Sequence, residues 1–171
     1  MKKRHYIFLL MILSLVSTHS FAQMPIDKGT SFINAGIGVG GYGYFNGSGV
    51  AITAGYETGV YKNITVGGIA GFRTYGSGTS SFDIGARGSY HFNELIKLTD
   101  DKLDLYAGLG VSFYRFTYGS SYVGISNAAY TTAYVPIHIG ARYLFASNLG
   151  GFAEVSSSLA TLRLGLTFKL K

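Results

Sequence analysis

The sequence has no cysteine, few charged residues and, beyond residue 22, no long apolar run. Without cysteine the chain forms neither a disulfide framework nor a thiolate metal site. Without about 18 consecutive apolar residues, the chain beyond residue 22 cannot cross a membrane as a helix. Charged residues make up only 13% of the chain, whereas a surface that meets water usually has about a quarter of its positions charged. This shortage of charge is the first indication that the outer face does not meet water.

The first 22 residues have the pattern of a secretory signal peptide. Three cations at 2–4 precede an apolar stretch at 6–16, and "SFA" at 20–22 has small residues two apart, as at a cleavage site. The apolar stretch is shorter than the roughly 20 residues that a membrane-spanning helix needs. We therefore predict a signal peptide over 1–22 and one domain over 23–171. A retained N-terminal anchor helix is the alternative.

The basic net charge owes much to this leading segment. Its three cations account for half of the net charge of +6, because all eight acidic residues follow residue 22. No run of lysine or arginine remains beyond it. The sequence therefore predicts no nucleic-acid partner.

Apolar and polar residues alternate in eight segments. In the last one, "LRLGLTFKL", leucine and phenylalanine alternate with charged residues, glycine and threonine. Residues two apart lie on the same face of a β-strand, so this pattern predicts strands. Most segments have the 9–11 residues that a tilted strand needs to cross a bilayer. The segments are 31–40, 49–59, 63–73, 82–92, 103–115, 133–145, 150–157 and 160–170.

Two kinds of connection alternate between these segments. One kind is longer, uncharged and rich in glycine, serine and tyrosine: 40–49, 74–81 and 117–132. The other kind is short or charged: 60–63, 93–102 and 146–149. Such alternation favours an up-and-down antiparallel barrel whose two ends face different compartments. Within 93–102, "NELIKLTDDK" is a candidate for a short helical turn.

Either of two barrels could carry the pattern. A soluble lipocalin-like barrel has its apolar face inside, around a ligand, whereas a membrane barrel has its apolar face towards lipid. The polar face here is dominated by glycine, and aromatic residues fall near strand ends on the apolar face. Arg87 is central in its segment and would cost roughly 2–4 kcal/mol on the lipid side. We therefore predict an all-β, eight-stranded antiparallel transmembrane β-barrel.

Charged residues on the polar face nearly balance, as burial of ions requires. We predict that they form a network in a lumen filled by side chains. The predicted network is Glu57, Arg73, Asp83, Arg87, Asp104, Arg142, Glu154, Arg163 and Lys169.

The signal peptide, the eight segments and the apolar C-terminal strand resemble small outer-membrane β-barrel proteins of the OmpA/OmpX type. "HFNELIKLTDDKLDLYAGLGVSF" at 91–113 resembles the fourth and fifth strands of porin-like barrels common in Bacteroidetes. The resemblance implies a monomer in the outer membrane of a Gram-negative bacterium, with both termini periplasmic and no cofactor.

The same resemblance makes the C-terminal strand the signal that the barrel assembly machinery reads. Family members usually end in an aromatic residue, whereas here Phe168 precedes Leu170 and Lys171. Its predicted lipid-facing residues are Leu162, Leu164, Leu166, Phe168 and Leu170. Pro136 fits badly within the sixth segment, because a closed barrel has no free edge. A bulge there, or a strand that starts near Ile137, would remove the conflict.

Candidate catalytic groups are few. His91 and His138 are the histidines beyond residue 22, and Asp83 or Asp104 could orient one of them beside a serine. A lipid-modifying enzyme is therefore an alternative, but no His-x-Ser pair occurs and we favour structural roles. Two histidines without a carboxylate pair also make a metal site improbable. We predict no enzyme activity, no cofactor and no metal.

Aromatic residues are frequent in the longer connections. They are expected to contact lipopolysaccharide or an extracellular ligand. The predicted residues are Tyr42, Tyr44, Tyr75, Tyr118, Tyr122 and Tyr130. The sequence thus predicts a non-enzymatic membrane protein with a structural or surface-interaction role. The alternative is a narrow porin-like channel gated by lumen ion pairs such as Glu154 with Arg87 and Arg142.

Overall fold

The computed structural model describes residues 24–41, 49–76, 78–119 and 128–170. The predicted signal peptide, residues 1–22, lies outside these described residues. So do three of the predicted loop tyrosines, Tyr42, Tyr44 and Tyr122. The described part of the chain contains no helix that is long and apolar enough to cross a membrane.

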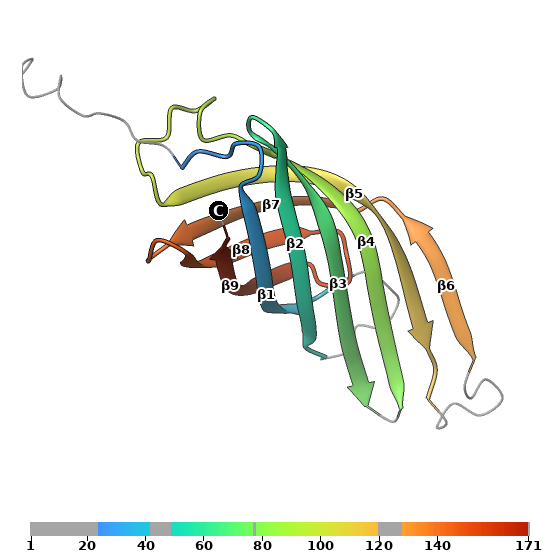
Figure 1. Ribbon diagram of the computed structural model, residues 1–171. Coiled ribbons are helices and arrows are strands. Elements are labelled where there is room, and N and C mark those ends of the chain that lie inside the picture. The colour runs from blue at the N-terminus through green and yellow to red at the C-terminus, as the bar shows by residue number, and fades with distance from the viewer. Residues whose placement is uncertain (1–23, 42–48, 77, 120–127, 171) are drawn as a thin grey trace, which may run out of the picture.

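The described chain is built from antiparallel β-strands. The segments are β1 (Ser31–Val39), β2 (Ala51–Tyr61), β3 (Ile64–Gly76), β4 (Thr79–His91), β5 (Leu103–Thr117), β6 (Ala129–Tyr134), β7 (Ile137–Leu144), β8 (Leu149–Ser156) and β9 (Leu162–Lys169). Neighbours along the chain pair with one another, except that β6 and β7 both pair with β5. β1 also pairs with β9, so the sheet closes on itself (Figure 1). Because β6 and β7 are two parts of one strand, the predicted eight-stranded up-and-down barrel is confirmed.

The interruption between β6 and β7 falls at Pro136. Leu109 pairs with Ile137 and Ser112 pairs with Tyr134, so both strands advance by three residues and none is inserted. The Pro136 carbonyl accepts a hydrogen bond of 2.9 Å from a backbone N–H of β5. Proline has no N–H with which to return that bond. The strand therefore restarts at Ile137, one of the two solutions expected from the sequence, and it does so without a bulge.

Two connections are shorter than the sequence predicted. β3 runs to Gly76 and β4 starts three residues later, so most of the predicted 74–81 connection is strand. The turn between them has Gly76 and Gly78 at φ of +87° and +77°, which glycine adopts without steric cost. β6 begins at Ala129, inside the predicted 117–132 connection. The prediction was wrong there because pairing with a neighbouring strand outweighs the weak strand propensity of glycine and serine.

One side of the barrel is taller than the other. β3, β4 and β5 contain 13, 13 and 15 residues, whereas β1, β8 and β9 contain 9, 8 and 8. β1 starts and β9 ends at the same end of the barrel, which we call the terminal end. The tall side, continued by β6, projects at the opposite or distal end, at the lower right of Figure 1.

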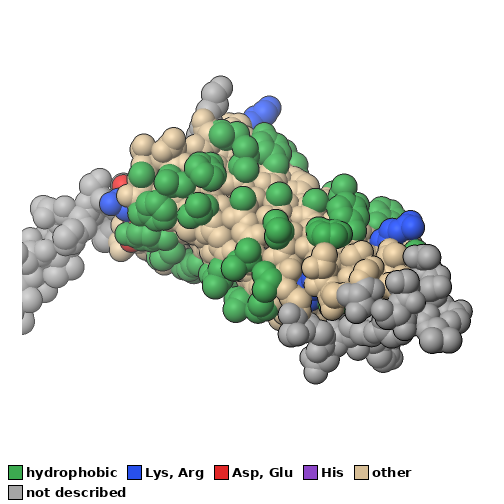
Figure 2. Space-filling model, turned by 90° about the horizontal axis from the view of Figure 1, so that it is seen from below, with side chains coloured by type: hydrophobic (Ala, Val, Ile, Leu, Met, Phe, Trp, Pro, Cys, Tyr) green, Lys and Arg blue, Asp and Glu red, His purple; other side chains and the backbone are tan. Residues whose placement is uncertain are grey.

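The wall of the barrel is apolar outside and polar inside. On β9, the side chains of Leu164 and Leu166 are 50% and 48% exposed, whereas those of Arg163 and Thr167 are 4% and 0% exposed. Figure 2 shows one face, on which hydrophobic side chains are widely spread and few charged ones are visible. This arrangement is the reverse of that in a soluble barrel.

Aromatic side chains lie on the outer surface near both ends. Tyr56, Tyr90 and Tyr143 lie towards the terminal end and are 40–46% exposed. Phe72 and Phe82 face each other across β3 and β4 towards the distal end. Tyr90 and Phe82 share one face of β4. Because the strand rises about 3.3 Å per residue and is tilted, the two residues are separated by roughly 20 Å along the barrel axis. This separation approaches the apolar band of about 25 Å in membrane barrels.

Candidate functional site in the barrel lumen

The lumen has three layers along its axis. An apolar cluster closes each end, and ion pairs fill the centre. The layers follow from strand alternation, because every second residue of each strand points inward. Eight strands leave an interior that side chains just fill.

Arg142 on β7 joins two acids at the terminal side of the central layer. Its Nη1 lies 3.0 Å from Asp104 Oδ2, and its Nη2 lies 3.3 Å from Glu57 Oε2. The guanidinium also stacks between two rings, 4.0 Å from the centroid of Phe32 and 4.9 Å from that of Tyr106. Because Arg142 is fully buried, these contacts replace the water that the cation loses.

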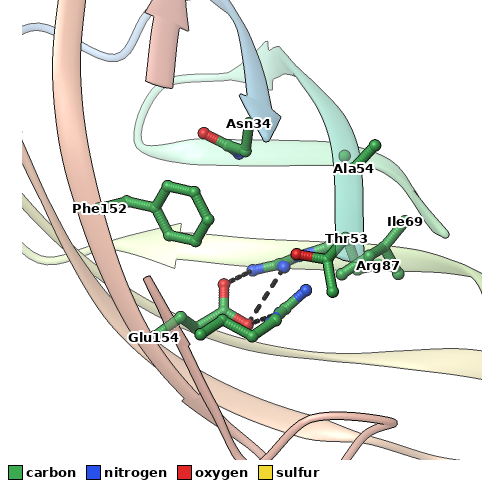
Figure 3. Close-up of a pocket in the computed structure, with 9 residues that line it drawn as sticks. Asn34, Thr53, Ala54, Ile69, Arg87, Phe152 and Glu154 are labelled. Carbon is green, nitrogen blue, oxygen red and sulfur yellow. Dashed lines mark hydrogen bonds and ion pairs between the residues drawn. The ribbon is translucent and has the colours of Figure 1, made fainter. Parts of the chain in front are cut away.

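Arg87 on β4 continues the chain of ion pairs towards β8. Its Nε lies 3.2 Å from Glu57 Oε1, and its Nη2 lies 2.8 Å from Glu154 Oε2. Glu154 also contacts Arg163 through its other oxygen and accepts a hydrogen bond of 3.1 Å from the Tyr106 hydroxyl. Figure 3 shows Arg87 and Glu154 meeting across the lumen from facing walls. Acids and arginines thus alternate across the barrel.

The buried charges cancel. Burial without net charge is what a low-dielectric interior requires, because an unpaired buried ion is far more costly than a paired one. The buried acids are Glu57, Asp83, Asp104 and Glu154, and the buried bases are Arg73, Arg87, Arg142 and Arg163. Lys169, predicted with them, is half-buried at the terminal end of β9 and joins none of the ion pairs of the described residues.

Two of the predicted network residues have partners of their own. Asp83 accepts a hydrogen bond from the Tyr134 hydroxyl. Arg73 donates to the Gly40 carbonyl and lies 5.8 Å from the ring of Tyr75. Both side chains are inside the barrel, as strand alternation predicts, but they lie closer to the distal end than the central chain of ion pairs.

His91 lies between a hydroxyl and a carboxylate. Its Nδ1 is 2.7 Å from Asp104 Oδ1, and its Nε2 is 3.0 Å from Thr65 Oγ1. The order hydroxyl, imidazole, carboxylate is that of a catalytic triad. All three side chains are 0% exposed, so no substrate reaches the hydroxyl. Sequence reasoning missed Thr65, whose only signal was its inward position on β3.

His138 has a separate partner. Its Nε2 lies 2.9 Å from Ser89 Oγ. A Cβ added to Gly108 would fall 2.8 Å from the imidazole, so the ring occupies space that only a glycine leaves open. Among the described residues no group of three or more histidine, aspartate and glutamate side chains could hold a metal ion.

The segment before β1 folds across the terminal end of the lumen. Met24 and Ile26 are 2% and 1% exposed and cluster with Phe32 and Leu144. The Ile26 carbonyl accepts a hydrogen bond of 2.9 Å from the Asn63 N–H in the β2–β3 turn. This segment therefore closes the terminal end, a position that no pattern in its residues predicts.

The connection between β8 and β9 closes the distal end. Leu159 and Ala160 are 2% and 0% exposed and cluster with Ala51, Tyr114 and Phe116 inside the barrel. The connection thus points into the lumen instead of away from it. Together the two apolar clusters enclose the ion pairs.

One small cavity adjoins the ion pairs. It is lined by Asn34, Thr53, Phe152, Arg87 and Glu154, among others (Figure 3). The volume in which the centre of a water molecule fits is about 10 Å³. The cavity therefore has room for about one water molecule. This cavity is thus too small for a solute larger than water.

The three described tyrosines among the predicted loop aromatics do not share one environment. Tyr75 lies in β3 and Tyr130 in β6, so their assignment to loops was wrong. Tyr75 and Tyr118 pack against the distal apolar cluster inside the barrel, whereas Tyr130 is 56% exposed. The reason is the length of β3, which carries Tyr75 on its inward face, and of β5, which ends directly before Tyr118.

No protein-family model and no curated protein matches the sequence. Among solved structures, the N-terminal β-barrel domain of Pseudomonas aeruginosa OprF matches with a TM-score of 0.60 and 16% identity, over 84% of this chain and 98% of that one. A de novo designed transmembrane β-barrel matches at 0.56 and 18%, over 86% and 100%. Ail of Yersinia pestis in a phospholipid bilayer nanodisc matches at 0.51 and 14%, over 84% and 100%. At such identities the likeness shows the fold, which is that of transmembrane β-barrels.

Proposed function

We propose that this protein is an integral outer-membrane β-barrel with a non-enzymatic role in envelope structure or surface interaction. The reversal of polarity across the barrel wall carries the proposal. Leucine and isoleucine face outward on every side of the wall, as Ile52, Ile139 and Leu164 do with 69%, 61% and 50% exposure. In water, a protein with such an apolar surface would aggregate, whereas lipid stabilises it.

The proposal includes a location and an orientation. Export by the signal peptide at 1–22 delivers the chain to the outer membrane of a Gram-negative bacterium, where it is monomeric. The terminal end is periplasmic and the distal end faces outward, in contact with lipopolysaccharide. The assembly machinery recognises the β9 strand, whose last lipid-facing residue is Phe168, together with Leu170 directly after it.

Single cysteines test the membrane assignment, because the chain has none of its own. In lipid vesicles, Leu164→Cys is expected to resist a charged, water-soluble maleimide until the protein is unfolded. Tyr130→Cys, on the projecting side, is the matched control and is expected to react at once. Rapid labelling of Leu164→Cys in vesicles, or a chain that stays monodisperse in buffer without detergent, would contradict the proposal.

The β6 strand supports the surface-interaction role. Among the described strands it pairs only with β5. The Pro136 carbonyl accepts a hydrogen bond from β5, and the Ala128 carbonyl accepts one from the residue directly after β5. By alternation, Thr131 and Ala133 therefore direct their N–H and C=O groups away from β5. β6 carries no charge and no proline, the usual protections of an edge strand. Such an edge binds an extended segment of a partner protein by strand addition.

A backbone substitution tests this edge. Ala133→Pro removes one outward N–H and leaves the β5–β6 hydrogen bonds in place. Displayed peptides selected on the barrel in nanodiscs are expected to lose binding to Ala133→Pro and to keep it with Ala133→Ser. Binders that tolerate Ala133→Pro would argue against strand addition.

The absence of enzyme activity is part of the proposal. The Thr65–His91–Asp104 group has triad order but no access to solvent. We expect no lipid A hydrolysis or acyl transfer by the purified barrel in lipid vesicles. Turnover that disappears in His91→Ala and persists in His138→Ala would contradict this expectation.

A second candidate is a narrow passive channel gated by the lumen ion pairs. The favouring observation is that Glu154 contacts both Arg87 and Arg163, so one arginine can leave while the other stays paired. Opening also requires Leu159 and Ala160 to leave the lumen. Stable conductance steps in planar bilayers that disappear in Glu154→Ala would favour the channel, and silence would favour the structural role.

A further inference from the structure

At the terminal end, the β4–β5 connection exposes two apolar side chains. Leu95 and Ile96 are 67% and 51% exposed, and neither joins the apolar cluster that closes this end of the lumen. Tyr90 of β4 and Phe92, the first residue after β4, have rings that meet edge to face at 5.3 Å. The connection therefore starts at the aromatic belt of the terminal end.

The exposed pair lies on a formed helical turn. The Ile96 N–H donates to the Phe92 carbonyl at 3.0 Å, which closes one turn of helix and confirms the turn suggested by the sequence. The Leu98 N–H donates to Asn93 at 2.8 Å, and Lys97 has a φ of +52°. These features define a Schellman end with Lys97 as its left-handed residue. Ile96 and its neighbour are thus held in a defined direction.

Side-chain contacts fix this turn to the rim of the barrel. Glu94 accepts hydrogen bonds of 2.7 Å from Lys62 Nζ and from Asn63 Nδ2, both in the β2–β3 turn. The bond from Lys62 lowers the pKa of the Glu94 carboxyl, and the same bond raises the pKa of Lys62. Asn93 donates to Asp104 at 3.2 Å inside the barrel. Glu94 is thus held at the rim and Asn93 in the lumen, whereas the Leu95 side chain is exposed.

The chemistry of the pair fits a lipid interface better than a protein partner. Two side chains supply far less than the roughly 800 Å² that each partner buries in a stable protein interface. The lipid-facing surface of the barrel, by contrast, is continuous with the turn through Phe92. Lys97 follows directly, and a lysine can bury its stem while its ammonium reaches lipid phosphates.

We propose that Leu95 and Ile96 insert into the headgroup boundary of the membrane leaflet at the terminal end, and that Lys97 pairs there with lipid phosphate. The inference rests on the proposed membrane-spanning barrel. The turn thereby anchors the β4–β5 hairpin, which is part of the tall side of the barrel, against displacement along the membrane normal.

Tryptophan fluorescence tests the anchor, because the chain contains no tryptophan. Leu95→Trp is placed in phosphatidylcholine and phosphatidylglycerol vesicles, with bromine on the acyl chains near the headgroups. We expect a blue-shifted emission and severalfold more quenching by brominated lipid than for Ser147→Trp, in the exposed β7–β8 turn at the same end. Ile96→Trp is a second probe of the same site and is expected to behave like Leu95→Trp.

Leu166→Trp on the outer face of β9 separates the two levels of the proposal. If Leu166→Trp is quenched by brominated lipid and both turn probes respond only to aqueous acrylamide, the anchor is refuted and the membrane barrel stands. If Leu166→Trp is not quenched either, the membrane assignment itself fails. Turn probes that neither brominated lipid nor acrylamide quenches in these vesicles would show burial against protein and overturn the lipid anchor.

Discussion

At the scale of single residues, Glu154 is a lumen ion with several partners. Glu154 accepts from Arg87, Arg163 and Tyr106, so three side chains lose a contact if its charge is removed. Arg87 would retain Glu57, whereas Arg163 has no second ion pair among the described residues. A buried arginine without a counter-ion is costly.

Glu154→Gln is therefore expected to lower the free energy of unfolding by about 3–5 kcal/mol, because it leaves buried positive charge uncompensated. The measurement is the urea midpoint of the barrel in lipid vesicles. Glu94→Gln is the matched control, since it removes an exposed ion pair with Lys62, and is expected to leave the midpoint nearly unchanged. Equal midpoints for Glu154→Gln and the parent chain would show that the network does not hold the lumen.

Glycines on the inner face make room for large side chains. Gly36 and Gly165 face each other across β1 and β9. A Cβ added to Gly36 would lie 3.0 Å from the Phe152 ring, and one added to Gly165 would lie 2.8 Å from it. The Phe152 ring therefore packs directly against the backbone of these two glycines.

Gly36→Ala should destabilise the barrel by about 1–3 kcal/mol, since its Cβ would lie 2.5 Å from the Leu164 carbonyl oxygen and 3.0 Å from Phe152, so that both β9 and the ring must shift. Gly68→Ala is the control, because its Cβ would point outward with its nearest neighbour at an ordinary 3.6 Å. Both variants are compared by heat-modifiable gel migration and by urea unfolding. A loss of stability in Gly68→Ala as large as in Gly36→Ala would argue against packing as the cause.

At the scale of elements, periodicity predicted the strands but not their partners. Alternation is local, so the inward face of β9 could be read directly from its sequence. The ion pair of Arg142 with Glu57 joins residues 85 apart, and only the register of the closed sheet brings them together. The inward folding of Leu159 and Ala160 had no periodic signal at all, because a connection of five residues carries none.

Pro136 offers a test of the break between β6 and β7. Pro136→Val restores an N–H that can donate to the Gly110 carbonyl, and this bond contributes about 0.5–1.5 kcal/mol. The new amide at 136 is expected to exchange with deuterium as slowly as β7 amides. Exchange as fast as at Ser147, in an open turn, would mean that the break has a cause other than the missing donor.

At the scale of the whole molecule, the barrel separates two differently exposed ends. The start of β1, the end of β9 and the 93–102 connection lie at the terminal end, whereas β5 ends and β6 begins at the distal end. The orientation follows from this topology once the termini are taken as periplasmic. Because each strand reverses the direction of the chain, the end at which one connection lies determines the end at which every other connection lies.

Proteinase K added to intact cells is expected to cleave within 117–132 and to spare 93–102. A broad protease is needed, because 117–132 contains no lysine or arginine. Cells with a permeabilised outer membrane are the control, and there 93–102 should become accessible. The reverse pattern on intact cells would invert the proposed orientation.

The unequal height of the wall has a mechanical consequence. β6 is held by β5 through the pairs between Ser112–Thr117 and Ala129–Tyr134, and β5 continues unbroken to the opposite rim. A tether bound along β6 and pulled along the barrel axis would load this ladder in shear, so its hydrogen bonds would share the force. A sideways pull would peel them apart one after another. The β5–β6 pair would therefore resist a pull along the barrel axis far more strongly than a pull at right angles to it.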